Sequence, residues 1–139
     1  MLKEMGHTDI RIMILGEGPE RERLEEIART LDVDATFFGY LPHAQMAPYL
    51  AASDILVNSF VRKAPQSIVS KVGDYLAAAK PMINTLANPE FMTKVEADGF
   101  GINVQSENPV ELAAAILQLK EDNEARERMS KAARHIAEE

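Results

Sequence analysis

The chain contains 139 residues, of which 46% are hydrophobic and 27% are charged, and it carries a formal net charge of −7 and no cysteine. This length fits one domain with a substantial core, and the acidic excess argues against a nucleic-acid partner because phosphate-backbone binding requires an excess of Lys and Arg. A chain without cysteine has no disulfide framework and no thiolate chemistry. No apolar run approaches the roughly 20 residues of a membrane-spanning helix. We therefore expect a cytoplasmic protein without a transmembrane segment.

Strand and helix signals alternate along the whole chain. An apolar run at residues 11–15 ends at Gly16 and predicts a strand that is buried on both faces. The later strand signals are short apolar runs at residues 35–38, 54–58, 81–84 and 101–104. The helix signals between them start at Pro19 or cover residues 45–52, 66–79 and 90–97. Two helices finish the chain, and their predicted N-cap residues are Asn108 and Asn123.

This alternation predicts the fold class. Strands that alternate with helices indicate parallel strands joined by right-handed crossovers, and hence a Rossmann-like, doubly wound α/β domain with helices on both faces of its sheet. We expect a single domain over residues 1–139. Ligands of such domains bind beyond the carboxyl ends of the strands. The candidate positions are therefore residues 16–18, 39–41, 59–67 and 85–89.

The predicted helix at 66–79 is the most informative segment. Its apolar positions fall on one stripe, whereas Ser67, Lys71 and Asp74 fall on another. A helix start above the carboxyl end of a parallel strand favours an anion, because its backbone N–H groups have no partner within the helix. Lys71 would add a phosphate contact and Asp74 a hydroxyl acceptor, a combination that suits a nucleotide, including one that carries a sugar. The alternative is a surface ion pair between Lys71 and Asp74.

Other signals are weaker. The Gly16-x-Gly18 pattern lacks a third glycine at position 21, so a plain strand-to-helix turn is favoured over a dinucleotide fingerprint. Arg62 and Lys63 are placed either to clamp a phosphate or to lie in a solvated loop. No histidines have metal-ligand spacing, and the sequence predicts no metal site.

Four segments carry a family resemblance: Ile-Leu-Gly-Glu-Gly-Pro at 14–19, Phe-Phe-Gly-Tyr-Leu at 37–41, Ala-Ala-Ser-Asp-Ile-Leu-Val-Asn-Ser at 51–59, and the stretch 70–81. This ordered set resembles the C-terminal, donor-binding domain of retaining GT-B glycosyltransferases of the group 1 type. The resemblance implies a hexosyltransferase of polysaccharide biosynthesis. Such an enzyme transfers a sugar, with retention, from a nucleotide-diphosphate sugar to a glycan or lipid-linked acceptor. It implies no essential metal or other cofactor.

The resemblance also implies roles for individual residues. The family's Glu-x7-Glu motif matches Gln66, which departs from the pattern at the donor-sugar contact, and Asp74, which would bind the ribose. Lys71 would support the diphosphate, and the backbone N–H groups of Ser67 and Ile68 would hold its distal phosphate. The remaining positions lie in the first half of the chain. There Gly16 and Gly18 would let the backbone approach the ligand, and the nucleobase loop would consist of Gly39, Tyr40 and Leu41.

Two parts of that family are missing from this sequence: the N-terminal acceptor-binding domain and the first strand of the donor domain. We therefore expect a fragment of a two-domain enzyme that is inactive by itself, with a gap in its sheet that favours self-association. The full-length enzyme is expected in the cytoplasm, with peripheral attachment to the inner membrane face as an option. Two alternatives stay open: a stand-alone nucleotide-binding or scaffold module without catalysis, and half of a nucleotide-sugar epimerase.

Overall fold

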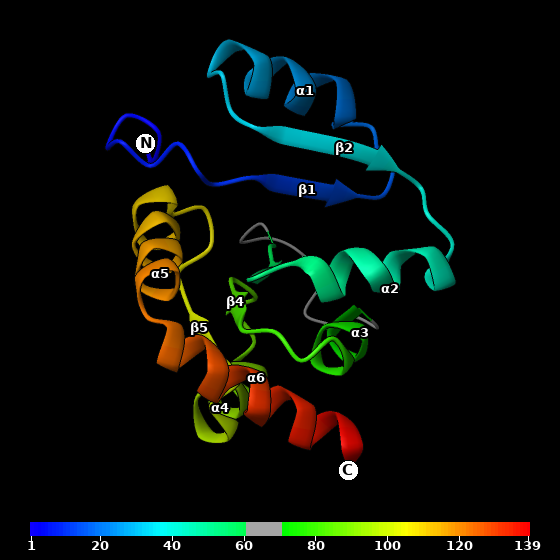
Figure 1. Cartoon of the computed structure of the whole chain (residues 1–139), viewed down its shortest axis with the longest axis vertical. Coiled ribbons are helices and arrows are strands. Elements are labelled where there is room, and N and C mark those ends of the chain that lie inside the picture. The colour runs from blue at the N-terminus through cyan, green and yellow to red at the C-terminus, as the bar shows by residue number, and fades with distance from the viewer. Residues whose placement is uncertain (61–70) are drawn as a thin grey trace. The chain divides into compact units, whose positions relative to one another are not determined.

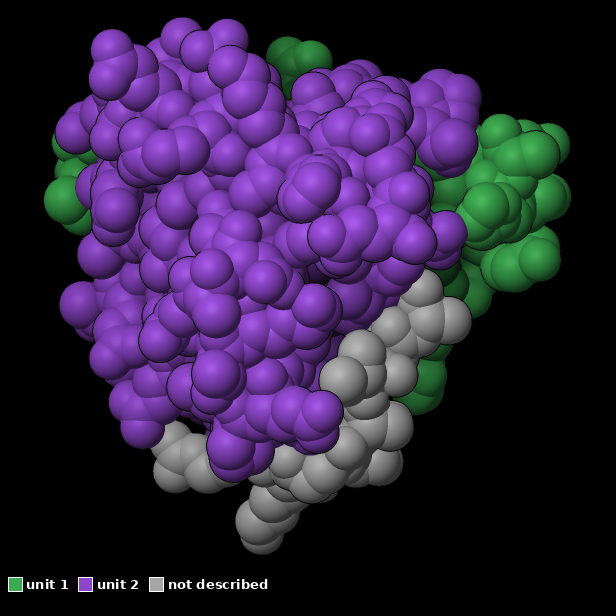
Figure 2. All heavy atoms as spheres, turned by 90° about the horizontal axis from the view of Figure 1, so that it is seen from below, with its two compact units in different colours: residues 1–46 green, residues 47–139 purple. Residues whose placement is uncertain are grey.

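The computed structural model describes residues 1–60 and 71–139. The chain divides into two compact units, residues 1–46 and 47–139, which Figure 2 shows in different colours. The first elements in chain order (Figure 1) are β1 (Ile12–Leu15), α1 (Arg21–Thr30), β2 (Ala35–Gly39), α2 (His43–Ala52) and β3 (Leu56–Asn58). They are followed by α3 (Lys71–Ala77), β4 (Met82–Asn84), α4 (Pro89–Asp98), β5 (Gly101–Asn103), α5 (Pro109–Glu121) and α6 (Asn123–Glu138).

The first unit contains a two-stranded parallel sheet and one accompanying helix. β1 pairs with β2 in the register Ile12 to Ala35, and α1 lies alongside β2 (Figure 1). Gly39 is the one residue of this unit that is buried. The prediction that the first strand is buried on both faces is wrong, since Ile12 is 42% exposed. Two strands and one helix offer too little surface to cover both sides of β1.

The second unit contains a three-stranded parallel sheet in the order β3-β4-β5. Its central strand β4 is buried throughout, and successive side chains of this strand enter two different cores because strand side chains alternate between faces. Met82 belongs to a core formed with α3, α4 and the second half of α6. Ile83 belongs to a core formed with α5 and the first half of α6. Helices therefore cover both faces of this sheet, as predicted for a doubly wound α/β fold.

Helix ends follow the predicted capping residues with one exception. The side-chain oxygen of Asn108 accepts a hydrogen bond from Glu111 N at 3.1 Å, which confirms Asn108 as the N-cap of α5. The prediction of Asn123 as the last N-cap is wrong. Asp122 has this role, because its Oδ1 accepts from Ala125 N at 2.9 Å while Asn123 is already the first helical residue.

α1 begins at Arg21 with Glu20 at its N-cap, two residues after the predicted start at Pro19. The first part of the helix predicted at 66–79 lies outside the described residues. The described part, α3, buries Val72 and Leu76, which belong to the predicted apolar stripe.

Candidate functional site

The carboxyl ends of β1 and β2 meet at two glycines. Gly16 N donates a hydrogen bond to Gly39 O at 2.8 Å, and both residues have positive φ values, 128° at Gly16 and 72° at Gly39. L-residues rarely adopt such backbone conformations, so glycine is favoured at both positions. The structure thus brings together two of the residues that were predicted to approach a nucleotide.

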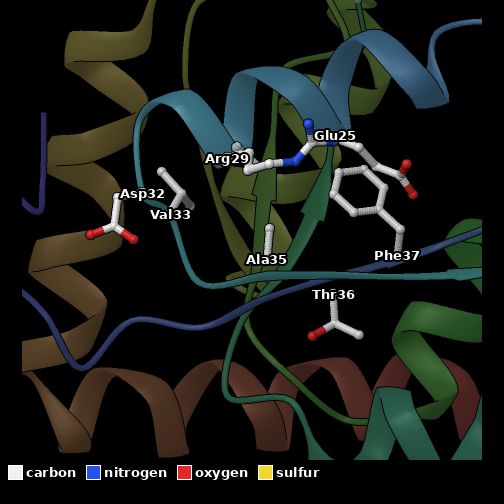
Figure 3. Close-up of a pocket in the computed structure, with 8 residues that line it drawn as sticks. Glu25, Arg29, Asp32, Val33, Ala35, Thr36 and Phe37 are labelled. Atoms are coloured by element: carbon white, nitrogen blue, oxygen red, sulfur yellow. The ribbon is translucent and has the colours of Figure 1, made fainter.

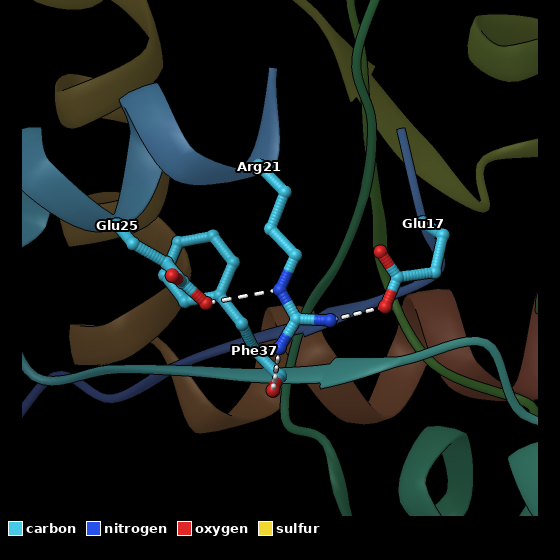
Figure 4. Close-up of polar contacts among 4 residues, drawn as sticks. All are labelled: Glu17, Arg21, Glu25 and Phe37. Atoms are coloured by element: carbon cyan, nitrogen blue, oxygen red, sulfur yellow. Dashed lines mark hydrogen bonds and ion pairs between the residues drawn. The ribbon is translucent and has the colours of Figure 1, made fainter. Parts of the chain in front are cut away.

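An ion pair lies against the second of these glycines. A Cβ atom added to Gly39 would lie 2.6 Å from Glu17 Oε1 and 3.0 Å from Arg21 Nη1. Figure 4 shows the Arg21 guanidinium between two carboxylates: it is paired with Glu17 through Nη1 and donates to Glu25 Oε1 from Nε at 2.9 Å. Its Nη2 also reaches the carbonyl oxygen of Phe37 at 3.4 Å. The missing side chain at Gly39 makes room for this network.

Arg21 was not among the residues predicted for the site. The hydrogen bond to Glu25 is the main cause that raises the pKa of Arg21, and the charge of Glu17 adds to it. The available signal was the spacing of Arg21 and Glu25, since residues four apart face each other on a helix. Glu17 precedes α1, so helical spacing does not predict its contact with Arg21. The network joins α1 to the end of β2 and thereby supports the loop that begins at Gly39.

The other residues of the first unit that were predicted to contact the nucleotide lie next to Gly16 and Gly39 in the chain. The Tyr40 side chain follows Gly39 directly and is 76% exposed. Leu41 is half-buried, and a Cβ added to Gly18 would meet no atom within 4 Å. Open space at Gly18 and an exposed ring at Tyr40 are compatible with a ligand contact, which stays a prediction.

A separate cavity lies between α1 and the first part of β2 (Figure 3). It has a volume of about 480 Å³, and Ala35 and Phe37 point toward the helix whereas Thr36 points away from it. None of the residues predicted to bind a nucleotide lines this cavity. We therefore do not assign it to the candidate site.

In the second unit, Lys71 and Asp74 lie on α3, three residues apart. Both are half-buried. Burial lowers the pKa of Lys71, because water stabilises the ammonium better than the protein surroundings do. The Lys71 Nζ atom lies 5.0 Å from the centre of the Phe60 ring, which is a cation–π distance.

The neighbouring Tyr75 ties α3 to the edge of the sheet. Its hydroxyl donates to the carbonyl oxygen of Val57 at 3.4 Å. Burial is the main cause that raises the Tyr75 pKa, and the negative charge of Asp74 adds to it. The Asp74 carboxylate therefore lies close enough to Tyr75 to disfavour the negatively charged form of its hydroxyl.

Three asparagines form a hydrogen-bonded ladder at the carboxyl ends of β3, β4 and β5, where the register aligns Asn58, Asn84 and Asn103. Asn58 Nδ2 donates to Asn84 Oδ1 at 2.9 Å, and Asn84 Nδ2 donates to Asn103 Oδ1 at 3.0 Å. The orientation of the central amide follows from Leu86, whose N–H donates to Asn84 Oδ1 and whose carbonyl oxygen accepts from Asn84 Nδ2. Asn58 Oδ1 is buried without a hydrogen-bond partner in the described part of the chain.

Several predicted residues lie outside the described residues. These are the donor-sugar contact Gln66, the phosphate-binding Ser67 and Ile68, and the basic pair Arg62 and Lys63. Among the described residues, no group of three or more His, Cys, Asp or Glu side chains is arranged to hold a metal ion. Within residues 1–60 and 71–139, no helix combines the length and apolar character needed to cross a membrane.

Solved structures with the same arrangement define the fold class. A glycosyltransferase from Rickettsia africae is similar over 98% of this chain and 37% of its own length, with a TM-score of 0.79 and 19% identity. The Anabaena protein HepE, solved in complex with UDP, is similar over 92% of this chain and 36% of its own, with a TM-score of 0.77 and 21% identity. At these identities the likeness shows the fold, which is that of the GT-B glycosyltransferases.

The sequence comparison then gives the family. The family model described as glycosyl transferases group 1 matches residues 1–122, and the chain belongs to this family. A related protein of Rhizobium meliloti (strain 1021), the lipopolysaccharide core biosynthesis glycosyltransferase LpsD, is 30% identical over 132 residues. That match covers 93% of this chain and 36% of LpsD, so the chain spans about a third of the length of this relative.

Proposed function

We propose that this chain is the donor-binding part of a glycosyltransferase that takes a sugar from a nucleoside-diphosphate sugar. Membership of the group 1 family supports transferase activity, and HepE, which shares the fold, has been solved with UDP and with UDP-glucose. The observation that carries the proposal is Lys71. This half-buried cation forms no ion pair with a carboxylate among the described residues and is therefore suited to bind an anion.

The main electrostatic task of such an enzyme is to stabilise the negative charge that develops on the departing nucleoside diphosphate. Lys71 performs this task by binding the diphosphate, helped by the backbone N–H groups of Ser67 and Ile68. Asp74 accepts hydrogen bonds from the ribose hydroxyls, because an ionised carboxylate has only acceptors. Gln66 contacts the transferred sugar through its amide.

The first unit supplies the nucleobase contacts in this proposal. Gly39 and the following Tyr40 and Leu41 form the base-binding loop, and the Arg21 network supports that loop from α1. Gly16 and Gly18 keep side chains away from the ligand. No essential metal takes part, because Lys71 and the backbone N–H groups supply the positive charge.

The finer features of the reaction are part of the same proposal. The sugar is transferred with retention of configuration to a glycan or a lipid-linked acceptor, which a separate acceptor-binding domain holds. The proposed location is the cytoplasm, since a chain without cysteine has no disulfide that requires an oxidising compartment. The chain alone is expected to bind the donor without transferring its sugar.

Calorimetric titration with UDP, GDP, ADP and UDP-glucose tests the proposal. We expect one of these ligands to bind, Lys71→Met to weaken its affinity about tenfold or more by removing a charge-assisted contact, and Asp74→Ala to weaken it by a similar factor. Lys94→Met and Asp98→Ala are the matched controls, because these two exposed residues pair with each other on α4. A full panel without binding, or equal losses in the control variants, would contradict the proposal.

A stand-alone nucleotide-binding module is the second candidate, and Gln66 in place of the family's glutamate favours it. The two candidates differ once the chain is supplied with an acceptor-binding domain from a relative. The transferase proposal predicts sugar transfer by that combination and none by the 139-residue chain. The module proposal predicts binding without transfer in both cases, and transfer by the isolated chain would contradict both candidates.

A further inference from the structure

The surroundings of Lys71 differ from those of an ordinary surface lysine. Its ammonium group lies 5.0 Å from the centre of the Phe60 ring, and no described carboxylate pairs with it. The side chain is half-buried, and burial lowers its pKa. The charge is thus held next to an aromatic face in a place where water solvates it poorly.

An aromatic face and a carboxylate affect such a cation differently. The ring attracts the ammonium through its quadrupole and leaves the net positive charge in place. A carboxylate would neutralise that charge, and an incoming anion would first have to displace it. Phe60 therefore keeps Lys71 in a defined position and leaves its charge free to attract a phosphate.

The position of Phe60 is itself fixed by Thr85, the residue that directly follows β4. Thr85 Oγ1 accepts a hydrogen bond from Phe60 N at 2.7 Å and lies 3.1 Å from Phe60 O, to which the hydroxyl donates. The Thr85 backbone N–H also donates to Asn58 O at 3.0 Å, which continues the β3–β4 pairing to the end of β3. Thr85 is 6% exposed, so these bonds are protected from competition with water. The contacts fix the backbone of Phe60 relative to the central strand.

We propose that Phe60 and Thr85 are positioning residues for an anion contact made by Lys71. Thr85 holds the Phe60 backbone, the Phe60 ring holds the Lys71 ammonium, and Lys71 meets the diphosphate group of the ligand. This inference rests on the proposed function for the identity of the ligand. It adds two residues that act through Lys71 and do not touch the nucleotide.

Binding of inorganic pyrophosphate by the 139-residue chain tests the proposal without involving a base or a sugar. We expect Lys71→Met to weaken pyrophosphate binding about tenfold or more, and Phe60→Leu and Thr85→Val to weaken it about threefold to tenfold. In the Lys71→Met background, the same two substitutions should have no further effect, because each acts through the lysine. Phe60→Tyr and Thr85→Ser, which keep the ring and the hydroxyl, should retain wild-type affinity. Thr93→Val is the matched control, since the Thr93 hydroxyl bonds to the backbone of α4 at Pro89 O.

Proton NMR of the ligand-free chain gives a second measurement. The Lys71 side-chain protons next to the Phe60 ring should be shifted to lower frequency by its ring current. Phe60→Leu should abolish this shift, Thr85→Val should reduce it and Thr93→Val should leave it unchanged. Pyrophosphate should move the same signals.

The proposal is overturned if pyrophosphate leaves the Lys71 signals of the wild-type chain unchanged, or if Phe60→Leu and Thr85→Val weaken binding equally with and without Lys71. These results are distinct from a failure of the proposed function. A chain that binds UDP but gives either of them retains the function and loses this inference. A chain that binds pyrophosphate through Lys71 but no nucleoside diphosphate retains the Phe60 and Thr85 roles and loses the proposed ligand.

Discussion

In the second unit, helices cover both faces of the β3-β4-β5 sheet, and Met82, Ile83 and Phe100 are at most 1% exposed. In the first unit, one helix accompanies two strands, and Leu24 and Ile27 of α1 remain 41% exposed. Both units have strands of similar apolar composition and helices with an apolar stripe. The burial of an apolar side chain therefore depends on how many helices and strands pack over it, because it is stabilised only where a second surface excludes water.

Truncation of a leucine in each unit is the test with the largest expected effect. Leu119 is 0% exposed and packs with Ile83, so Leu119→Ala should lower the free energy of unfolding by about 2–5 kcal/mol through lost burial and a cavity. Leu24→Ala removes the same atoms from a 41% exposed side chain, and its cost should stay below about 1 kcal/mol. Urea unfolding followed by circular dichroism measures both values. Equal costs would mean that Leu24 is buried as deeply as Leu119 in solution.

Substitution of the buried asparagines of the second unit is the test with the next largest expected effect on the free energy of unfolding. Asn84 is 1% exposed and satisfied on both sides of its amide, so Asn84→Ala leaves several buried groups without partners. We expect this variant to lose about 2–4 kcal/mol of unfolding free energy. Asn58 makes a single side-chain bond within the ladder, and Asn58→Ala should cost about half as much.

Urea unfolding of both asparagine variants, with Asn88→Ala as a helix-cap comparison, checks this order. The Asn88 side chain accepts one bond from Phe91 N at the start of α4, and its loss should cost about 1 kcal/mol. If Asn58→Ala destabilises as much as Asn84→Ala, then Oδ1 of Asn58 has a donor in solution.

Substitution of two glycines of the first unit by alanine should have intermediate effects on the free energy of unfolding. Gly39 has a φ of 72°, so Gly39→Ala should cost about 1–2 kcal/mol. The added Cβ would also displace the Glu17 carboxylate, whose Oε1 would lie 2.6 Å away. Gly18 has open space around it and no positive φ, so Gly18→Ala should be neutral or stabilise by about 0.4–1 kcal/mol. Thermal unfolding and hydrogen exchange of the Gly16 amide, which bonds to Gly39 O, measure the difference. Unchanged exchange in Gly39→Ala would contradict the hydrogen-bonded contact between the carboxyl ends of β1 and β2.

The sequence predicted which segments form strands and helices, because turn residues and apolar runs are local signals. It did not predict the exposure of β1, since the run from Ile12 to Leu15 reads the same whether or not further layers cover it. The prediction of Asn123 as the N-cap of α6 was also wrong. Asp122 and Asn123 are both good N-cap residues, and only the backbone shows which of them precedes the first turn.

The candidate site was predictable to a similar extent. Lys71 and Asp74 follow from helical spacing, and Gly16 and Gly39 follow from strand ends. Phe60 and Thr85 also lie in strand-end segments that were predicted as candidate positions, but their contact could not be predicted, because they are 25 residues apart and meet only through the pairing of β3 with β4. The asparagine ladder depends on the same strand register, which a sequence alone does not give.

The smallest expected effect is a difference in pH dependence between the units. Burial lowers the pKa of Lys71 from 10.5, so the unfolded chain binds more protons than the folded chain between that lowered value and 10.5. The free energy of unfolding should therefore rise with pH in this window, and Lys71→Met should lose the rise. In the first unit, the hydrogen bond from Lys3 lowers the pKa of Asp32 from 3.8, and the resulting stabilisation should be lost as pH falls below 3.8.

Urea unfolding from pH 7 to pH 10 compares the wild-type chain with Lys71→Met, and Lys94→Met serves as the control. The Lys94 pKa is raised by its hydrogen bond to Asp98, so that variant should keep the alkaline rise. Tyr75, whose pKa is raised from 10.0, acts in the opposite direction only above pH 10, which sets the upper limit of the titration. Identical profiles for the wild-type chain and Lys71→Met would mean that water solvates the ammonium fully. The start of α3 would then be as open to solvent as the exposed face of α1.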